Sequence, residues 1–417
     1  MKKPVVSLSI ALWLLGAVCI VAQAGAKTRT VGPAQTGCPD GKSEYTSISA
    51  AVAAASPGDV IEICPAVYPE QLIITKPLTL RGVEFNGFSR ALLQPTLSDL
   101  QGLATEAVIT VIGTHDVTID NLAVDASQNT VASCSPGVAG IHFYNASGTV
   151  TNSAIFGAKL PNPLSCTSLP FGNGFAILVD DSRSGPFAVS VVNNSIHDYT
   201  ANGVQANGSG IDVEIAHNNI SGIGPATGIF QFAVFLLNGT VGYIHDNIIT
   251  EGLCGSIDPT DCINIRSEGI TLRAIGDGTV VEHNYISNAQ SGIFINGANN
   301  LKVSKNVISN IDAMSGMDIQ GSASGSFTNS HISGNSIGNV GPINAYASNN
   351  EEGCGINEYS GTGVSGNEIT DNTIDDAYCG VAYVSADFVQ GDAYFNTLYT
   401  ELNADLYPTT FPPATEP

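Results

Sequence analysis

Apolar and polar residues alternate in short stretches of this chain, most clearly between Gly292 and Asn310. Each alternating stretch is long enough for one short β-strand, and the three stretches here are residues 293–295, 301–303 and 307–308. A tight turn at Asn306 separates the second stretch from the third. Beyond the N-terminal region, no apolar pattern with the 3.6-residue period of a helix persists. The pattern predicts three short strands in this unit.

A short frame, an Asn or Asp followed two residues later by Ile, recurs along the chain. Its copies begin at Asn194, Asn218, Asp246, Asn284, Asn306, Asn335 and Asn372. The intervals are 24, 28, 38, 22, 29 and 37 residues, which indicates a basic period that inserted loops lengthen irregularly. Three short strands per repeat can bury their apolar sides only if repeats stack at about 4.8 Å. We therefore expect an all-β fold, a single parallel β-helix of about ten coils.

The Asn residues of this frame would stack on one another, each side-chain amide hydrogen-bonding the next. The stack predicts that Asn306 is buried between Asn284 and Asn335. Replacing Asn306 with Leu would leave neighbouring amides unpaired and cost about 1–3 kcal/mol.

The N-terminal region opens the repeats differently. Ser47–Ala55 has the spacing of a short amphipathic helix, which ends at Ser56-Pro57-Gly58. Strands are expected to follow at residues 60–63, 72–74 and 78–80. A helix at this point would cover the open end of the solenoid, whose unpaired edge otherwise invites aggregation.

Four segments of this region resemble the opening segment of the pectin-lyase-like right-handed parallel β-helix superfamily. They are Tyr45–Val52, Ser56–Asp59, Tyr68–Glu70 and Lys76–Leu80. The Asn-x-Ile repeats are similar to those of the same superfamily, including its periplasmic copper-protein-maturation type. The resemblance covers residues 43–400 and implies a right-handed β-helix with an N-terminal capping helix. It implies no single activity, because lyases, hydrolases, esterases, epimerases and non-catalytic members share the fold.

The motifs of the enzymes in this superfamily are incomplete. Polygalacturonase-like enzymes need four motifs, of which only Asp180-Asp181 is present. Asp258-Pro259 is followed by Thr260, where alginate epimerases have His. Val117–Asn121 resembles a pectate-lyase strand without its Trp and His, and the catalytic segments of pectin esterases are missing. The resemblance therefore implies the fold and leaves the reaction open.

The chain begins like an exported protein. Met1-Lys2-Lys3 is followed by the apolar run Val5–Val21 and by small-x-small cleavage sites. We expect a signal peptide at 1–24, an N-terminal extension at 25–42, the β-helix at 43–400 and a disordered Pro/Thr-rich tail at 401–417. No later segment is apolar enough for a membrane span, so the expected location is secreted or periplasmic.

Charge narrows the range of partners. Of 14 basic residues two leave with the signal, and the remaining twelve face 37 acidic ones, a net charge near −25. Such a field repels nucleic acid, so no nucleic-acid partner is expected. It also disfavours polyuronates unless Ca²⁺ or a local basic cluster screens them. The expected partner is an extracellular polysaccharide, the cofactor is open with Ca²⁺ as the candidate, and the sequence does not indicate an oligomeric state.

Eight cysteines remain after signal cleavage. An oxidising compartment favours disulfides, and the absence of a CxxC pair argues against a zinc site. The sequence allows about 105 pairings. The cysteines fall as neighbours along the chain, which favours Cys38–Cys64, Cys134–Cys166, Cys254–Cys262 and Cys354–Cys379.

Alternation also tells which residues of the first strand in each coil point outward. With Ile293 and Ile295 in the core, Phe294 and Asn296 point out. The same frame predicts four more pairs of outward-pointing residues in other coils: Leu178 and Asp180, Gln205 and Asn207, Thr271 and Arg273, and Asp318 and Gln320. In the superfamily this strand floors the substrate cleft. We expect Arg273 and Asp318 to be catalytic, and the substrate-binding residues to be Asn207, Phe294, Asn296 and Gln320.

The chemistry of these residue types supports the choice. Arg can bind a carboxylate or stabilise an enolate, Asp can accept a proton or hold Ca²⁺, and amides suit sugar hydroxyls. The alternative is a strand face that is polar only because it meets water.

Two further clusters are candidates for chemistry. His217, His245 and His283 each precede the turn in successive repeats and allow either a metal site or a stacked, hydrogen-bonded column. A straight stack would put the outer two about 9.6 Å apart, beyond the ligand shell of one ion. We therefore favour the column and predict no metal ligand.

The longest insertion lies between the turns at Asp246 and Asn284 and would carry Asp258, Asp261, Arg266 and Glu268. Cross-linked by Cys254–Cys262, it could wall a cleft beside Arg273.

Two functions stay open on the sequence alone. The first is a carbohydrate-active lyase, hydrolase or epimerase that works through the Arg273–Asp318 face. The second is a non-catalytic surface scaffold that binds glycan. Missing motifs favour the second, and the Arg/Asp/amide face favours the first. A periplasmic metal-handling protein is a distant third.

Overall fold

The structure is a computed structural model that describes residues 25–33, 38, 42–84, 90–98, 103–129, 135–160, 173–183, 185–223, 230–253, 267–320, 326–341, 353–360, 364–377, 379–383, 397–398 and 404–408. The expected signal peptide lies outside these residues. So do Cys134, Cys166, Cys254 and Cys262, and the insertion residues Asp258, Asp261 and Arg266.

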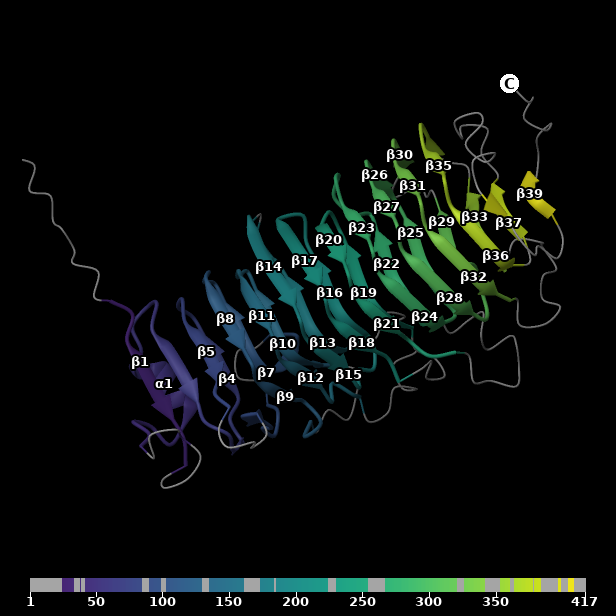
Figure 1. The fold of residues 1–417 in the computed structure, drawn as a ribbon. Coiled ribbons are helices and arrows are strands. Elements are labelled where there is room, and N and C mark those ends of the chain that lie inside the picture. Colours follow the sequence, from purple (N-terminus) through teal and green to yellow (C-terminus); the bar gives the residue numbers. More distant parts are fainter. Residues whose placement is uncertain are drawn as a thin grey trace, which may run out of the picture.

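Three parallel sheets run the length of the molecule and carry nearly all of the strands (Figure 1). Sheet A contains β1 (Thr28–Val31), β2 (Val60–Ile63), β5 (Thr79–Gly82), β8 (Val117–Asp120), β11 (Gly148–Thr151), β14 (Phe187–Val192), β17 (Ile211–Ala216), β20 (Val241–His245), β23 (Val280–Glu282), β27 (Lys302–Ser304), β31 (His331–Ser333) and β35 (Glu368–Thr370).

Sheet B contains β3 (Val67–Tyr68), β6 (Leu92–Leu93), β9 (Ala123–Asp125), β12 (Ala154–Phe156), β15 (Ser195–His197), β18 (Asn219–Ser221), β21 (Ile248–Thr250), β24 (Tyr285–Ala289), β28 (Val307–Ile311), β32 (Ser336–Val340), β36 (Thr373–Ala377) and β38 (Thr397–Leu398).

Sheet C contains β4 (Leu72–Ile74), β7 (Thr105–Ile112), β10 (Gly137–Tyr144), β13 (Gly174–Asp180), β16 (Asn202–Asn207), β19 (Gln231–Leu237), β22 (Ser267–Arg273), β25 (Ser291–Asn296), β29 (Met317–Gln320), β33 (Cys354–Ser360), β37 (Cys379–Tyr383) and β39 (Ala404–Pro408). A small fourth sheet joins β26 (Ala298–Asn299), β30 (Phe327–Thr328) and β34 (Val364–Ser365).

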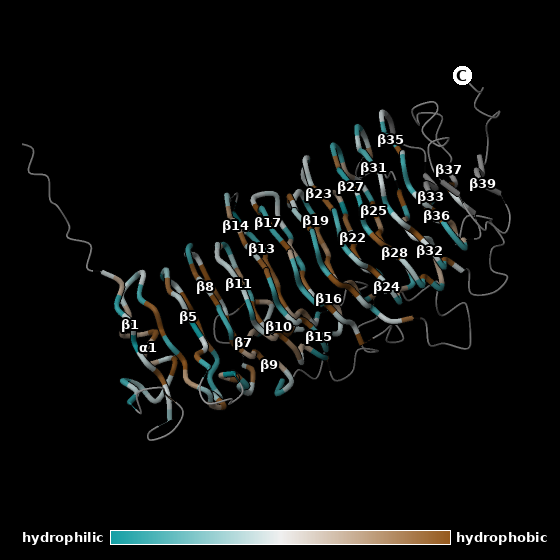
Figure 2. The backbone as a smooth tube through the Cα atoms, viewed as in Figure 1, coloured by the Kyte–Doolittle hydropathy of each residue, from teal (hydrophilic) through white to brown (hydrophobic). Residues whose placement is uncertain are grey.

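Each coil passes through sheets A, B and C in turn, and this confirms the right-handed parallel β-helix expected from the repeat. Among the described residues twelve strands lie in each large sheet, slightly more than the expected ten coils. The predicted strands of the 292–310 unit are β25, β27 and β28. Along the strands hydrophilic and hydrophobic residues alternate, as Figure 2 shows, so that each strand gives one side to a continuous aliphatic core.

The stacked Asn residues lie at the turn between sheets A and B. The side chains of Asn194, Asn218, Asn247, Asn284, Asn306, Asn335 and Asn372 form one hydrogen-bonded ladder. Asn306 is fully buried between Asn284 and Asn335, as predicted. The frame was wrong by one residue in a single coil, where Asn247 and not Asp246 enters the ladder.

The N-terminal end is capped as expected. Helix α1 (Ile48–Ala54) begins after the N-cap Ser47 and packs against β1, β2 and β4. The Glu70 carboxylate accepts hydrogen bonds from the backbone N–H groups of Ile48 (2.9 Å) and Ser49 (2.8 Å) at the first turn. The Tyr68-Pro-Glu70 segment therefore fixes the helix to the first coil.

At both ends of the chain, strands lie beyond the bounds expected for the β-helix. β1 lies in the 25–42 extension and adds an outermost strand to sheet A. Within the expected tail, Ala404–Pro408 forms β39 and pairs with β37, and the disorder of the remaining tail stays a prediction.

Among the cysteines, Cys38 and Cys64 form the predicted disulfide. Cys354 is also disulfide-bonded, and the residue opposite it in the neighbouring strand is Cys379. The pairing of Cys354 with Cys379 stays a prediction, as do the two pairs outside the described residues.

Candidate functional site

The outward residues of sheet C lie in the rows that alternation predicts. One row runs across six neighbouring strands through Asp180, Asn207, Leu237, Arg273, Asn296 and Gln320. The adjacent row runs through Leu178, Gln205, Phe235, Thr271, Phe294 and Asp318. The sequence frame omitted β19, which contributes Phe235 and Leu237 to these rows.

The two rows differ in exposure, which alternation alone does not reveal. Arg273, Asn296, Gln320 and Asn207 are half-buried, so they remain within reach of a ligand. Phe294 and Asp318 are each only 1% exposed, and the expectation that they face solvent is wrong. Nearby on this outer face, Phe175 and Leu178 form a small apolar cluster, separate from the core, with Ala107 and Ala139.

Hydrogen bonds hold the polar groups of this face in place. The Ser291 hydroxyl donates to Asp318 Oδ2 (2.9 Å), and the Asn296 amide donates to Gln320 Oε1 (2.6 Å). The Arg273 guanidinium lies over the Phe294 ring, 5.3 Å from its centroid. Cation–π contact of this kind orients a guanidinium without neutralising it.

Glu268 belongs to the same face and not to a loop. It was expected in the insertion, but it lies within β22, fully buried, and its Oε2 accepts a hydrogen bond from the Thr271 hydroxyl. Two buried carboxylates, Glu268 and Asp318, therefore lie two strands apart on sheet C, with β25 between them.

A second surface was missed by the sequence reasoning. An open groove of ≈ 590 Å³ lies on sheet A and crosses β8, β11, β14, β17, β20 and β23. We call it the sheet A groove. One register row along it consists of Thr118, Thr149, Ser190, Glu214, Tyr243 and Val280. The available signal was the alternation of the second strand in each coil, which places hydroxyl, carboxylate and phenol groups on one side.

Two separate sets of hydrogen bonds hold polar side chains of the groove. Ser190 donates to Glu214 Oε2 (2.6 Å), and Tyr243 donates to Glu282 Oε1 (3.0 Å). The hydrogen bond to Glu282 raises the pKa of Tyr243, and the hydrogen bond from Lys302 (2.7 Å) lowers the pKa of Glu282. Tyr243 nevertheless keeps 42% of its surface exposed, so the ring is available to a ligand.

Similarity to known proteins is confined to structure. No protein-family model and no curated protein matches the chain. A GH136 lacto-N-biosidase from Eubacterium ramulus has a similar structure, with 10% identity, 92% of this chain and 68% of that chain covered, and a TM-score of 0.52. This similarity concerns the fold alone, a parallel β-helix.

Two other solved structures are more distant. The Dettilon tailspike protein has 15% identity over 82% of this chain and 62% of its own, with a TM-score of 0.40. The A-module of an Azotobacter vinelandii mannuronan C-5 epimerase has 12% identity over 87% of this chain and 94% of its own, also with a TM-score of 0.40. This chain thus spans less than two thirds of the tailspike protein.

In the part of the chain that the structure describes, no helix is long and apolar enough to cross a membrane.

Proposed function

We propose that this protein binds an extracellular glycan, and that the ligand lies in the sheet A groove. The observation that carries the proposal is an open groove across six successive strands, lined by hydroxyls, carboxylates and one exposed tyrosine. Neighbouring strands are about 4.8 Å apart, close to the length of one sugar residue, so successive strands can contact successive sugars.

The charge of the groove favours a neutral glycan. Asp116, Asp212 and Glu214 line it, and their carboxylates accept hydrogen bonds from sugar hydroxyls but repel uronates. The exposed part of the Tyr243 ring offers an apolar contact for a sugar ring. A carbohydrate ligand agrees with the activity in the name of the lacto-N-biosidase, and the Cys38–Cys64 disulfide suits an extracellular location.

The test compares two tyrosines of similar exposure. Tyr243 is 42% exposed in the groove, and Tyr285 is 45% exposed on sheet B. Calorimetric titration with neutral cello-, xylo-, manno- and chito-oligosaccharides should show that Tyr243→Ala weakens binding roughly tenfold, about 1.4 kcal/mol. Tyr285→Ala should bind like the parent. If no oligosaccharide binds the parent, or if both variants bind equally, the groove is not a glycan site.

A second candidate function is glycan cleavage or epimerisation on sheet C. It is favoured by Arg273, held over Phe294 beside the half-buried amides of Asn296 and Gln320, with Asp318 in the adjacent row. In this proposal Arg273 binds an acidic sugar and the half-buried amides of Asn296 and Gln320 contact its hydroxyls, whereas the buried Asp318, hydrogen-bonded to Ser291, is a positioning residue. Asn207 lies two strands from Arg273 in the same row and would contact the second sugar along the chain.

This second candidate function is tested by measuring product formation. Reducing-end release and ultraviolet absorbance of an unsaturated product should appear with an acidic polysaccharide and should be lost in Arg273→Ala. Turnover that is unchanged in Arg273→Ala would exclude this role.

A further inference from the structure

A column of turn residues follows the Asn ladder on the outside of the helix. The residue immediately before each ladder Asn has a positive φ, and in five successive coils these residues are Asn193, His217, Asp246, His283 and Lys305. The three histidines therefore do not form the column expected from the sequence. Asp246 occupies the middle position, and His245 lies one residue earlier, at the end of β20.

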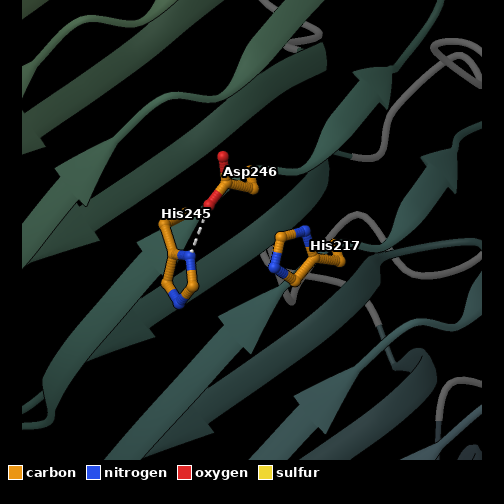
Figure 3. Close-up of side chains that lie close together, drawn as sticks. All are labelled: His217, His245 and Asp246. Carbon is orange, nitrogen blue, oxygen red and sulfur yellow. Dashed lines mark hydrogen bonds and ion pairs between the residues drawn. The ribbon is translucent and has the colours of Figure 1, made fainter.

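His245 brings a second imidazole beside this column. Its side chain is only 12% exposed and stacks on the Tyr243 ring, with the ring centroids 4.0 Å apart. Its Nδ1 lies 2.8 Å from Asp246 Oδ2, and its ring meets the His217 ring edge-on at 5.6 Å. Figure 3 shows both imidazoles and the carboxylate facing a common space. One donor atom from each of the three lies within 4.8 Å of the others.

A His-Asp pair alone does not indicate a metal site in this chain. His115-Asp116 and His197-Asp198 make the same contact, Nδ1 to Oδ2, at 2.6 and 2.8 Å, and both aspartates also have positive φ. The His-Asp contact is therefore a recurring feature of these turns. Only the third pair has a second imidazole beside it, because His217 from the preceding coil reaches the same carboxylate.

The surroundings of the cluster also favour a cation. Glu214 adds a second carboxylate, 3.6 Å from His245 Nε2. The geometric objection to three ligands in a straight stack no longer applies, because the donors come from two adjacent coils and surround one point.

We propose that His217, His245 and Asp246 bind one divalent transition-metal ion of the Zn²⁺, Ni²⁺ or Cu²⁺ type. Two imidazoles and one carboxylate suit these ions, whereas Ca²⁺ takes six to eight oxygen ligands. His217 and Asp246 are exposed, so their side chains can rotate to bring the donors to bonding distance, and water completes the coordination.

The test uses substitutions that the column itself tolerates. Asn occupies the same turn position in other coils, for example at Asn152 and Asn193, so His217→Asn and Asp246→Asn keep the positive φ at low cost. The matched control is His115→Asn, which removes the imidazole of a His-Asp pair without a second histidine. Each full-length protein, freed of metal by chelator, is titrated calorimetrically with ZnCl₂, NiCl₂ and CaCl₂.

We expect one Zn²⁺ or Ni²⁺ per chain in the parent and in the control, and no saturable Ca²⁺ binding at this site. His217→Asn and Asp246→Asn should each weaken Zn²⁺ binding roughly tenfold or more, since even the loss of an outer-shell partner can cost that much. Unaltered thermal unfolding without metal would show that both variants fold. Absence of Zn²⁺ binding by the parent, parent-like affinity in folded His217→Asn, or an equal loss in His115→Asn would each overturn the proposal.

Discussion

Replacement of Asn306 by Leu tests the Asn ladder directly. The Asn306 side chain is fully buried and makes four hydrogen bonds. It accepts from the backbone N–H (3.0 Å) and the side-chain amide (2.9 Å) of Asn284. It donates to Asn335 Oδ1 (3.0 Å) and to the Val281 carbonyl (3.0 Å). Leu has a similar volume but satisfies none of these groups.

The cost is set by the groups left without a partner. The Asn284 side-chain amide keeps the Ile244 carbonyl, and Asn335 Oδ1 keeps the Asn306 backbone N–H. The buried Asn284 backbone N–H has only Asn306 as its hydrogen-bond partner, so it is orphaned at about 1–3 kcal/mol. With the weaker ladder contacts added, Asn306→Leu should lower the free energy of unfolding by about 2–4 kcal/mol.

Two measurements locate the effect. Urea unfolding gives the loss of stability, and amide hydrogen exchange should show that the Asn284 N–H loses protection before distant coils do. Val307→Leu is the control, because Val307 is 41% exposed in the same coil and its change should stay within about 0.5 kcal/mol. An Asn306→Leu protein with parent-like stability and a protected Asn284 amide would refute the ladder as a source of stability.

Three other changes have defined outcomes. Glu70→Gln should destabilise the capping helix by about 0.5–2 kcal/mol in urea. Burial raises the pKa of Glu70, but the hydrogen bonds from the helix N-terminus outweigh it and lower the pKa. The parent should therefore lose this contribution to stability as pH falls through the lowered pKa. A parent that shows no acid-dependent loss of stability relative to Glu70→Gln would contradict this prediction. Glu251 is fully buried, and burial raises its pKa well above the ordinary value, so its contribution to stability falls as pH rises above about 4.3. Glu251→Gln should therefore be more stable than the parent at pH 8 relative to pH 5, and identical pH profiles would argue against a protonated Glu251 in the core. Cys64→Ser should lower the free energy of unfolding by about 2–4 kcal/mol, because it removes the Cys38–Cys64 disulfide. Peptide mapping of the parent under non-reducing conditions should recover the predicted pairs Cys354–Cys379, Cys134–Cys166 and Cys254–Cys262. Free thiols, or pairs between other cysteines, would reject this pairing.

The parts of the fold that depend on local pattern can be predicted from the sequence. Alternation at Ile293 and Ile295 and the Asn-x-Ile frame specify strand, turn and register, because a side chain that points inward in one coil must stack on its equivalent in the next. The same rule correctly predicts that Arg273, Asn296 and Gln320 share one row. The frame fails only at Asp246-Asn247, where either residue fits the local pattern and the hydrogen bonds to neighbouring coils decide between them.

Tertiary packing decides whether the outward side of a strand is buried and which side chains of adjacent coils lie beside it. Alternation gives the side of the strand on which Phe294 and Asp318 lie, but their burial depends on groups outside their own strand. The His217–His245–Asp246 cluster has the same origin. One-residue differences in frame between adjacent coils move His245 out of the column and put a carboxylate between imidazoles. A repeat pattern describes each coil in isolation, whereas a binding site is formed by side chains from several coils whose distances depend on how the coils stack.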